Sequence, residues 1–227
     1  MVDLPSGPTL RYREWGRPDG AVILLLHGTS SDGSTWRHVA PVLGEHFRVI
    51  APDLRGHADS EWPHHYSIEL MRDDVAALLE SLGVISAIVV GHSLGGVIAF
   101  LLAATRPELV RLLVLEEMPP PDAATPPRPL PMHPDPEERT DWRAVIAVRR
   151  WRNAAHPDWW RMANDIRAET LVLAGTRSDL DHARMRELVT AMPNARYVPV
   201  DLGHGIHVEQ PSVFLRVVGP FVQRYAK

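Results

Sequence analysis

The stretch that most constrains this chain is residues 88–96, Ile-Val-Val-Gly-His-Ser-Leu-Gly-Gly, where an apolar run ends in the pattern Gly-x-Ser-x-Gly. A helix-prone segment, residues 97–105, follows directly. In this order of strand, tight turn and helix, the pattern holds its serine in a strained turn with the hydroxyl clear of the sheet. Gly91 and Gly95 have no Cβ that would collide there. The stretch therefore predicts that Ser93 is a nucleophile.

Composition narrows the class of protein around this serine. The chain has 227 residues, 45% hydrophobic and 23% charged, which fits one globular domain or one domain with an insertion. It has no cysteine, which excludes disulfides, thiolate metal sites and a cysteine nucleophile. The net charge of −4 carries no block of like charge, so we expect no nucleic-acid partner.

Secretory signals and membrane spans both need apolar stretches of a characteristic length and setting. Residues 1–9 lack the cationic start and apolar centre of a secretory signal. Apolar runs such as residues 21–26 and 110–115 are strand-sized, far below the roughly 18 residues of a membrane span. We therefore expect a cytoplasmic protein with no membrane span.

Apolar strand-like runs alternate with helical segments along most of the chain. Because this alternation is typical of a mostly parallel sheet covered on both faces, the sequence predicts a doubly wound α/β fold. Pro199 cannot donate to a sheet ladder, so the last run is expected near an edge. Strands are expected at residues 10–15, 21–26, 47–51, 88–91, 112–115, 170–174 and 196–200, and helices at 35–43, 68–82 and 94–105.

Functional side chains follow several of these runs. In parallel α/β sheets, sites form from the loops at the carboxyl ends of the strands. Residues 27–31, Ser93, Glu116, Asp179 and His204 all fall at such positions. We therefore expect them to meet at one edge of the sheet although they are distant in sequence.

One segment differs in composition. Residues 119–136 are dense in proline and are expected to lack regular structure. Helices are expected next at 141–154 and 157–166, with Thr140 as N-cap and Pro157 in a first turn. Four of the seven tryptophans lie here. We interpret residues 118–168 as a short helical lid inserted after the sixth strand, with 1–117 and 169–227 forming the core.

Several motifs together carry a resemblance to a known family. In this order they resemble the serine-nucleophile branch of the α/β-hydrolase fold family, over nearly the whole chain from Leu10 to Tyr225. The chain is short for that family, which implies a reduced first strand and an abbreviated lid. The motifs are residues 27–29, 53–60, 91–96, 175–179 and 203–211.

The resemblance implies a catalytic triad in the chain order nucleophile, acid, histidine. Ser93, Asp179 and His204 fill it, with His204 as general base and acid and Asp179 as the orienting acid. Asp179 lies four residues after Gly175, whereas three is usual in the family.

Other residues compete for two of these roles. Asp181 is a weaker candidate for the acid, and Glu116 or Glu117 occupies an acid position that some relatives use. His207 competes with His204 for the base, and we expect it instead in a supporting position.

The remaining site predictions concern the oxyanion and the substrate. Leu94 opens the predicted helix, so its backbone N–H is free to face a developing oxyanion, and the family implies a second N–H at Thr29. Possible substrate contacts are Gly28, His92, Trp142, Trp159, Trp160 and His207.

The predicted function is hydrolysis of an ester, thioester or lactone of a small or medium apolar acyl group, without cofactor or metal. His64-His65 lacks the spacing and carboxylate company of a metal site. Serine at the turn argues against epoxide hydrolase and haloalkane dehalogenase relatives, which carry aspartate there. A cofactor-free haloperoxidase or a C–C bond hydrolase would use the same triad, and a non-catalytic binding protein is a further alternative. Monomer and homodimer both stay open.

Overall fold

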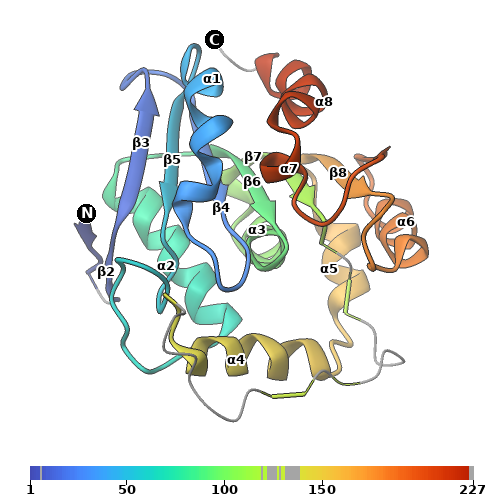
Figure 1. The fold of residues 1–227 in the computed structure, drawn as a ribbon, viewed down its shortest axis with the longest axis horizontal. Helices are drawn as coiled ribbons and strands as arrows, with labels where there is room; N and C mark the ends of the chain where they lie inside the picture. Colours follow the sequence, from blue (N-terminus) through green and yellow to red (C-terminus); the bar gives the residue numbers. More distant parts are fainter. Residues whose placement is uncertain (6, 119, 122–126, 128, 131–138, 225–227) are drawn as a thin grey trace.

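The computed structural model describes residues 1–227 except 6, 119, 122–126, 128, 131–138 and 225–227. Its centre is a seven-stranded sheet with the order β3-β5-β4-β6-β7-β8-β9 (Figure 1). β3 pairs antiparallel with β5, and every other neighbouring pair is parallel. The predicted α/β fold with a mostly parallel sheet is confirmed.

The strands and helices follow the predicted alternation. In chain order they are β1 Val2–Asp3, β2 Thr9–Leu10, β3 Tyr12–Gly16, β4 Val22–Leu26, the 3-10 helix η1 Gly33–His38, α1 Ala40–Gly44, β5 Arg48–Pro52, α2 Ile68–Ser81, β6 Ala87–His92, α3 Leu94–Thr105, the 3-10 helix η2 Pro107–Leu109, β7 Val110–Glu116, α4 Trp142–Asn153, α5 Trp159–Asp165, β8 Glu169–Gly175, α6 His182–Ala191, β9 Ala195–Val200, α7 Ile206–Glu209 and α8 Pro211–Gln223.

Two apolar layers lie on the two faces of the sheet. Successive side chains of a strand point to opposite faces, and in β4 Leu24 and Leu26 enter one layer while Ile23 and Leu25 enter the other. α2, α3, α5 and α6 cover the first face, and η1, α1 and α8 cover the second (Figure 1). All five side chains of β4 are buried, as expected for a central parallel strand.

Helix α2 shows how local sequence signals set the bounds of an element. The Ser67 side chain accepts a hydrogen bond from the Leu70 N–H and so caps the helix start. The chain leaves the helix at Gly83, whose φ of +68° suits glycine. The helix predicted over 68–82 is confirmed within one residue.

Three local predictions differ from the structure. The first predicted strand divides, because residues 9–10 pair with β1 in a separate small sheet while β3 forms the edge of the main sheet. The helix predicted over 35–43 splits at Val39 into η1 and α1, with Pro41 tolerated in the first turn of α1. Asp141, not Thr140, caps α4, since its carboxylate accepts the Arg143 N–H.

The remaining edge and helix predictions fare differently. α5 begins at Trp159, two residues later than predicted. β9, which contains Pro199, lies at the other edge of the sheet, as predicted. Among the helices that the structure describes, none combines the length and apolarity that a membrane crossing requires.

The segment expected as a lid lies between β7 and β8. Figure 1 shows α4 running across the lower side of the view, beyond the edge at which the parallel strands end. The start of α4 is tied to the loop after β5, because His64 and Tyr66 both hydrogen bond to the Asp141 carboxylate at 2.8 Å. The prediction for residues 119–136 falls mostly outside the described residues.

Candidate active site

The turn between β6 and α3 is strained at one residue. Ser93 has φ 52° and ψ −111°, in the left-handed region that non-glycine residues rarely adopt. A Cβ on Gly91 would collide with the Gly95 carbonyl, and a Cβ on Gly95 would collide with the Leu26 carbonyl. The two glycines therefore let the turn close tightly enough to lift Ser93 off the strand end, in the predicted order of strand, turn and helix.

A histidine and a carboxylate lie beside this turn. His204 follows β9, and its Nδ1 lies 3.1 Å from Oε2 of Glu117, a fully buried residue directly after β7. Since a carboxylate only accepts, the ring Nδ1–H donates to it. The other oxygen of Glu117 accepts the backbone N–H of Gly175 at 2.6 Å. Both oxygens are therefore occupied, which fixes the carboxylate and with it the tautomer of His204.

Among the described residues, His204 hydrogen bonds to Glu117, and no hydrogen bond or ion pair joins it to Asp179, its predicted partner. Glu117 has a φ of 54°, so the chain turns sharply at the end of β7. Asp179 lies instead in the exposed turn after β8, where the Ser178 N–H bonds back to the Gly175 carbonyl. The displaced spacing of Asp179 and the glutamates directly after an apolar strand were the sequence signals for this outcome.

Thr29 and Leu94, the two residues predicted to supply oxyanion-hole N–H groups, both line the cavity that contains Ser93. Leu94 is the first residue of α3, so its N–H has no acceptor within the helix. Thr29 lies in the loop after β4 and lines the same cavity as Ser93 and Leu94. The Gly95 N–H donates to the His27 carbonyl at 3.0 Å, which ties that loop to the turn.

Three of the predicted substrate contacts, Gly28, His92 and His207, are not among the described residues that line the cavity. A Cβ on Gly28 would lie 2.9 Å from Nδ1 of His92, so that loop and the turn are in close contact. His92 Nε2 donates to the His204 carbonyl at 2.8 Å. Burial lowers the pKa of His92 to about 4, so the ring is neutral near pH 7. His207 is buried against Trp36 with ring centroids 3.8 Å apart.

Ser93, Glu117 and His204 open into one cavity of about 180 Å³. Among the described residues no hydrogen bond joins the Ser93 hydroxyl to His204; such contacts often tighten only when substrate binds. Its apolar lining includes Val148 and Trp151 of α4, and charged side chains such as Arg152 line it as well. The described residues that line it are Thr29, Ile68, Ser93, Leu94, Val97, Glu117, Met118, Pro120, Pro121, Val148, Trp151, Arg152, Asn153, Asp179, Leu180, Asp181, Arg184 and His204.

The tryptophans predicted as substrate contacts lie elsewhere. Trp159 is buried and stacks on Phe100 with centroids 3.9 Å apart, because that face of α5 packs on α3. Trp160 packs under Arg184, and Trp142 lies at the start of α4. Trp151, one helical turn after Val148, is the tryptophan that lines the cavity.

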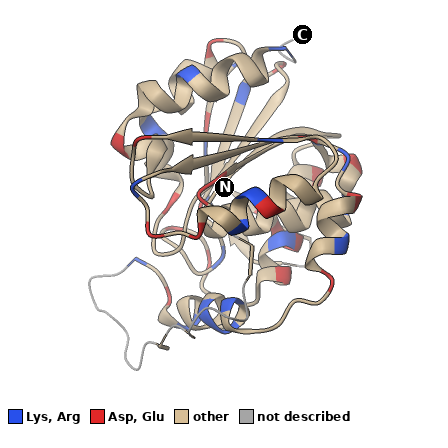
Figure 2. Ribbon diagram, turned by 90° about the vertical axis from the view of Figure 1, so that its right-hand side faces the viewer, with Lys and Arg blue, Asp and Glu red and all other residues tan. Residues whose placement is uncertain are grey.

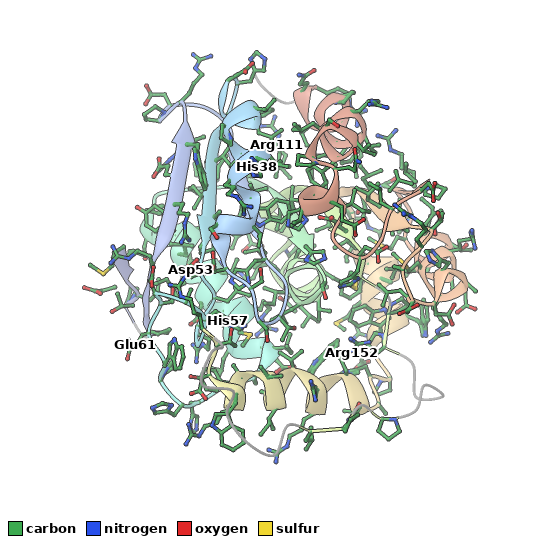
Figure 3. The ribbon with its side chains drawn as sticks, in the orientation of Figure 1. His38, Asp53, His57, Glu61, Arg111 and Arg152 are labelled. Carbon is green, nitrogen blue, oxygen red and sulfur yellow. The ribbon has the colours of Figure 1, made fainter. Side chains whose placement is uncertain are left out.

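Helix α4 contributes charge as well as apolar surface. It carries arginines but no acidic residue, and Figure 2 shows these positions in blue on the helix at the bottom of the molecule. Arg152, near the end of the helix, lines the cavity, and Figure 3 places it at the side of α4 that faces the strand ends. Within the part of the chain that the structure describes, no group of three or more histidine, aspartate or glutamate side chains is arranged to hold a metal ion.

Asp53 and His57, labelled in Figure 3, lie in the loop after β5. Asp53 is fully buried and accepts from Arg13 Nη1 at 2.6 Å and from the Gly33 N–H at 2.8 Å. Burial also lowers the pKa of His57 to about 3. These contacts hold two loops at the sheet edge, and neither residue lines the cavity.

Comparison with known proteins identifies the family. Residues 21–154 match the family model described as alpha/beta hydrolase fold. The chain belongs to the α/β-hydrolase fold family. The resemblance inferred from the motifs is thereby confirmed.

Individual relatives support the same class. AB hydrolase superfamily protein YfhM of Bacillus subtilis is 39% identical over 120 residues, 51% of this chain and 42% of that protein. Lipase LipV of Mycobacterium tuberculosis is 33% identical over 192 residues, 83% of this chain and 65% of that protein. The matches span less than two thirds of these relatives' own lengths. Epoxide hydrolases also occur among the relatives.

Solved structures share the fold. The enol-lactonase from Burkholderia xenovorans LB400 superimposes with a TM-score of 0.85 at 24% identity, covering 98% of this chain and 99% of that one. At this identity the likeness shows the fold alone.

Proposed function

We propose that this protein is a serine hydrolase that cleaves an ester, thioester or lactone bond through an acyl-Ser93 intermediate. The observation that carries the proposal is the Glu117–His204 hydrogen bond at 3.1 Å, in the same cavity as a serine held at φ 52°. A buried carboxylate on one ring nitrogen of His204 leaves the other nitrogen free to act as a base toward the serine.

The reaction follows from these positions. His204 Nε2 accepts the proton of the Ser93 hydroxyl as its oxygen attacks the substrate carbonyl carbon. The carbonyl oxygen becomes an oxyanion, which accepts hydrogen bonds from the backbone N–H groups of Leu94 and Thr29. The tetrahedral intermediate collapses, and the imidazolium protonates the leaving oxygen or sulfur. Water then attacks the acyl-serine by the same steps and releases the acid.

Glu117 replaces Asp179 as the orienting acid in this proposal. Its carboxylate holds the His204 ring by Nδ1 and stabilises the imidazolium that forms during attack. The Gly175 N–H on the other oxygen keeps the carboxylate from turning away. Asp179 lines the cavity wall and takes no part in the proposed proton transfer.

The cavity supports a small or medium acyl group. Its volume of about 180 Å³ and its apolar wall of Val97, Val148 and Trp151 suit a short aliphatic or aromatic chain. We propose that residues 118–168 act as the lid and that α4 supplies this wall. Serine at the turn favours ester chemistry over epoxide opening, and the lipase name of one relative agrees with it.

The experiment that tests the proposal is labelling with a fluorophosphonate probe, which reacts covalently with activated serines. Wild-type protein should be labelled and Ser93→Ala should not. Nitrophenyl esters of increasing chain length, acyl thioesters and lactones, each with Ser93→Ala as control, then identify the bond. Equal labelling of both proteins, or none of either, would refute the proposal.

A further inference from the structure

Glu116, one residue before Glu117, contacts both the nucleophile and the loop that carries the base. Its backbone carbonyl accepts the Ser93 N–H at 2.9 Å. Its carboxylate accepts the backbone N–H of His207 at 2.9 Å and the ring Nδ1–H of the same residue at 2.8 Å. Glu116 and His207 are both buried. One residue therefore joins the turn at Ser93 to the segment that follows His204.

The two consecutive glutamates hold two points of one short segment. Glu117 binds the ring of His204, and Glu116 binds His207, three residues later. Neighbouring side chains of a regular strand point to opposite faces. β7 ends at Glu116, and the left-handed backbone of Glu117 departs from the strand geometry so that both carboxylates reach residues 204–207.

His92 adds a third connection to the same segment. Its Nε2–H donates to the His204 carbonyl, and its ring packs against those of His204 and His207, with centroids 4.8 and 5.0 Å away. On the other side, His207 stacks on Trp36. The segment is thus held by bonds from β6 and β7 and by packing from η1, none of which uses the cavity.

We propose that Glu116 and His207 are positioning residues, which fix the base loop relative to Ser93 so that His204 lies in line for proton transfer. The proposal rests on the function proposed above. Neither residue touches the cavity, so both act through Ser93 and His204. A displacement of about 1 Å in such an arrangement costs on the order of 100-fold in rate.

A negative carboxylate, and not only a side chain of this size, is required at position 116. Two N–H donors of His207 converge on it, and a carboxylate offers acceptors to both. Burial on its own raises the pKa of Glu116, but His207 outweighs this effect and holds the pKa below its ordinary value. A glutamine would present one acceptor and one donor, so one of the two His207 N–H groups would face another donor.

The test compares Glu116→Gln with Asp74→Asn, a matched disruption of a buried carboxylate remote from the cavity. Asp74 forms a two-point ion pair with Arg55 between α2 and the loop after β5. At a temperature at which both variants are folded, we expect Glu116→Gln to lower kcat by about 10- to 100-fold with KM within about twofold. The pH dependence of kcat/KM should shift as well. Asp74→Asn should lower the melting temperature and leave kcat and the pH profile unchanged.

A second pair of variants keeps the proposal testable if Glu116→Gln does not fold. His207→Asn retains an amide N–H near the position of Nδ1, whereas His207→Leu removes the donor at similar volume. His207→Asn should keep at least about fivefold more kcat than His207→Leu. Equal kcat in the two variants, or a Glu116→Gln profile that matches Asp74→Asn, would overturn the proposal.

Fluorophosphonate labelling separates this outcome from failure of the proposed function. Wild-type protein that is not labelled at Ser93 would refute the function itself. Wild-type protein that is labelled, with Glu116→Gln labelled at the same rate, would refute only the positioning role.

Discussion

Two histidine–glutamate pairs lie side by side at the ends of β7 and β9, and their surroundings differ. In the first, Glu117 is buried but the His204 side chain is 46% exposed and lines the cavity. In the second, Glu116 and His207 are exposed by 0% and 1%, and His207 is stacked on Trp36. The residue types are the same, but only the first pair can meet a substrate.

Under the proposed mechanism, solvent access and not residue type distinguishes the histidine that reacts from the histidine that supports it. A base needs one ring nitrogen free toward the reacting hydroxyl, which His204 has at the cavity. His207 Nε2 is buried with no partner among the described residues. We therefore assign the reaction to the exposed pair and the geometry to the buried one.

Substitution of Glu117 tests most directly whether the Glu117–His204 pair, and not Asp179, carries out the proposed chemistry. Glu117→Gln should lower kcat about 10³-fold, because the amide cannot stabilise the imidazolium and favours the wrong tautomer of His204. Asp179→Asn, the matched control at the cavity wall, should stay within about threefold of wild type. Steady-state kinetics on the best nitrophenyl ester measure both. The opposite order would return the role of orienting acid to Asp179.

A second test measures how burial changes the pKa of a histidine that has no carboxylate partner. Burial lowers the pKa of His57 to about 3, so between about pH 6.5 and 3 the unfolded chain binds a proton that the folded chain refuses. Stability contributed by the neutral ring is complete above pH 6.5 and falls by about 1.4 kcal/mol per pH unit below it.

His57→Asn keeps a donor for the Arg55 carbonyl but does not titrate in this range. Urea unfolding at pH 7.5 and pH 5 should therefore show a smaller loss of stability for the variant, by about 2 kcal/mol. Equal losses in the two proteins would contradict a buried neutral histidine.

The division between cavity and core also applies to the tryptophans of residues 118–168. Trp151→Ala should raise KM about tenfold for apolar esters, because it removes part of the cavity wall, with a smaller change in kcat. Trp142→Ala, at the other end of α4, should stay within about twofold. If both variants behave alike, α4 acts as a whole and Trp151 has no particular contact with substrate.

The smallest expected effect concerns the attachment of α4. Asp141→Ala removes the cap of the helix and the acceptor for His64 and Tyr66, and should cost about 1 kcal/mol of unfolding free energy. Asp158→Ala, before α5, should cost less because its side chain caps no backbone N–H. Denaturant melts give both values. A change in kcat with Asp141→Ala would show that the cavity wall and the His204 pair are coupled.

Most of the fold could be predicted because its signals are local. Alternating apolar runs, Ser67 before α2 and Gly83 after it each act within a few residues. The split at Val39 and the two-residue β2 were missed, because they depend on which strand the chain meets in the folded protein. Local propensity does not contain that information.

The site was predictable where neighbouring residues in the sequence determine a residue's environment. The strained turn at Ser93 depends on its own glycines. The partner of His204 depends on three elements, β7, β8 and the loop after β9. No local sequence pattern shows how far each of them extends at the edge of the sheet. For the same reason the sequence could not show which tryptophan lines the cavity. Trp159 lies on the face of α5 that packs on α3, whereas Trp151 lies on the face of α4 that lines the cavity.

The strained backbone of Ser93 lowers the stability of the fold, while its hydroxyl is needed for the proposed activity. A residue other than glycine at φ 52° costs of order 1 to 3 kcal/mol, borne by the rest of the fold. Glycine at this position would make the chain more stable and, without a hydroxyl, inactive under the proposed mechanism. Selection for folding stability alone would therefore favour glycine over serine at this position. Engineering for heat resistance should exclude position 93 and its flanking glycines from variation.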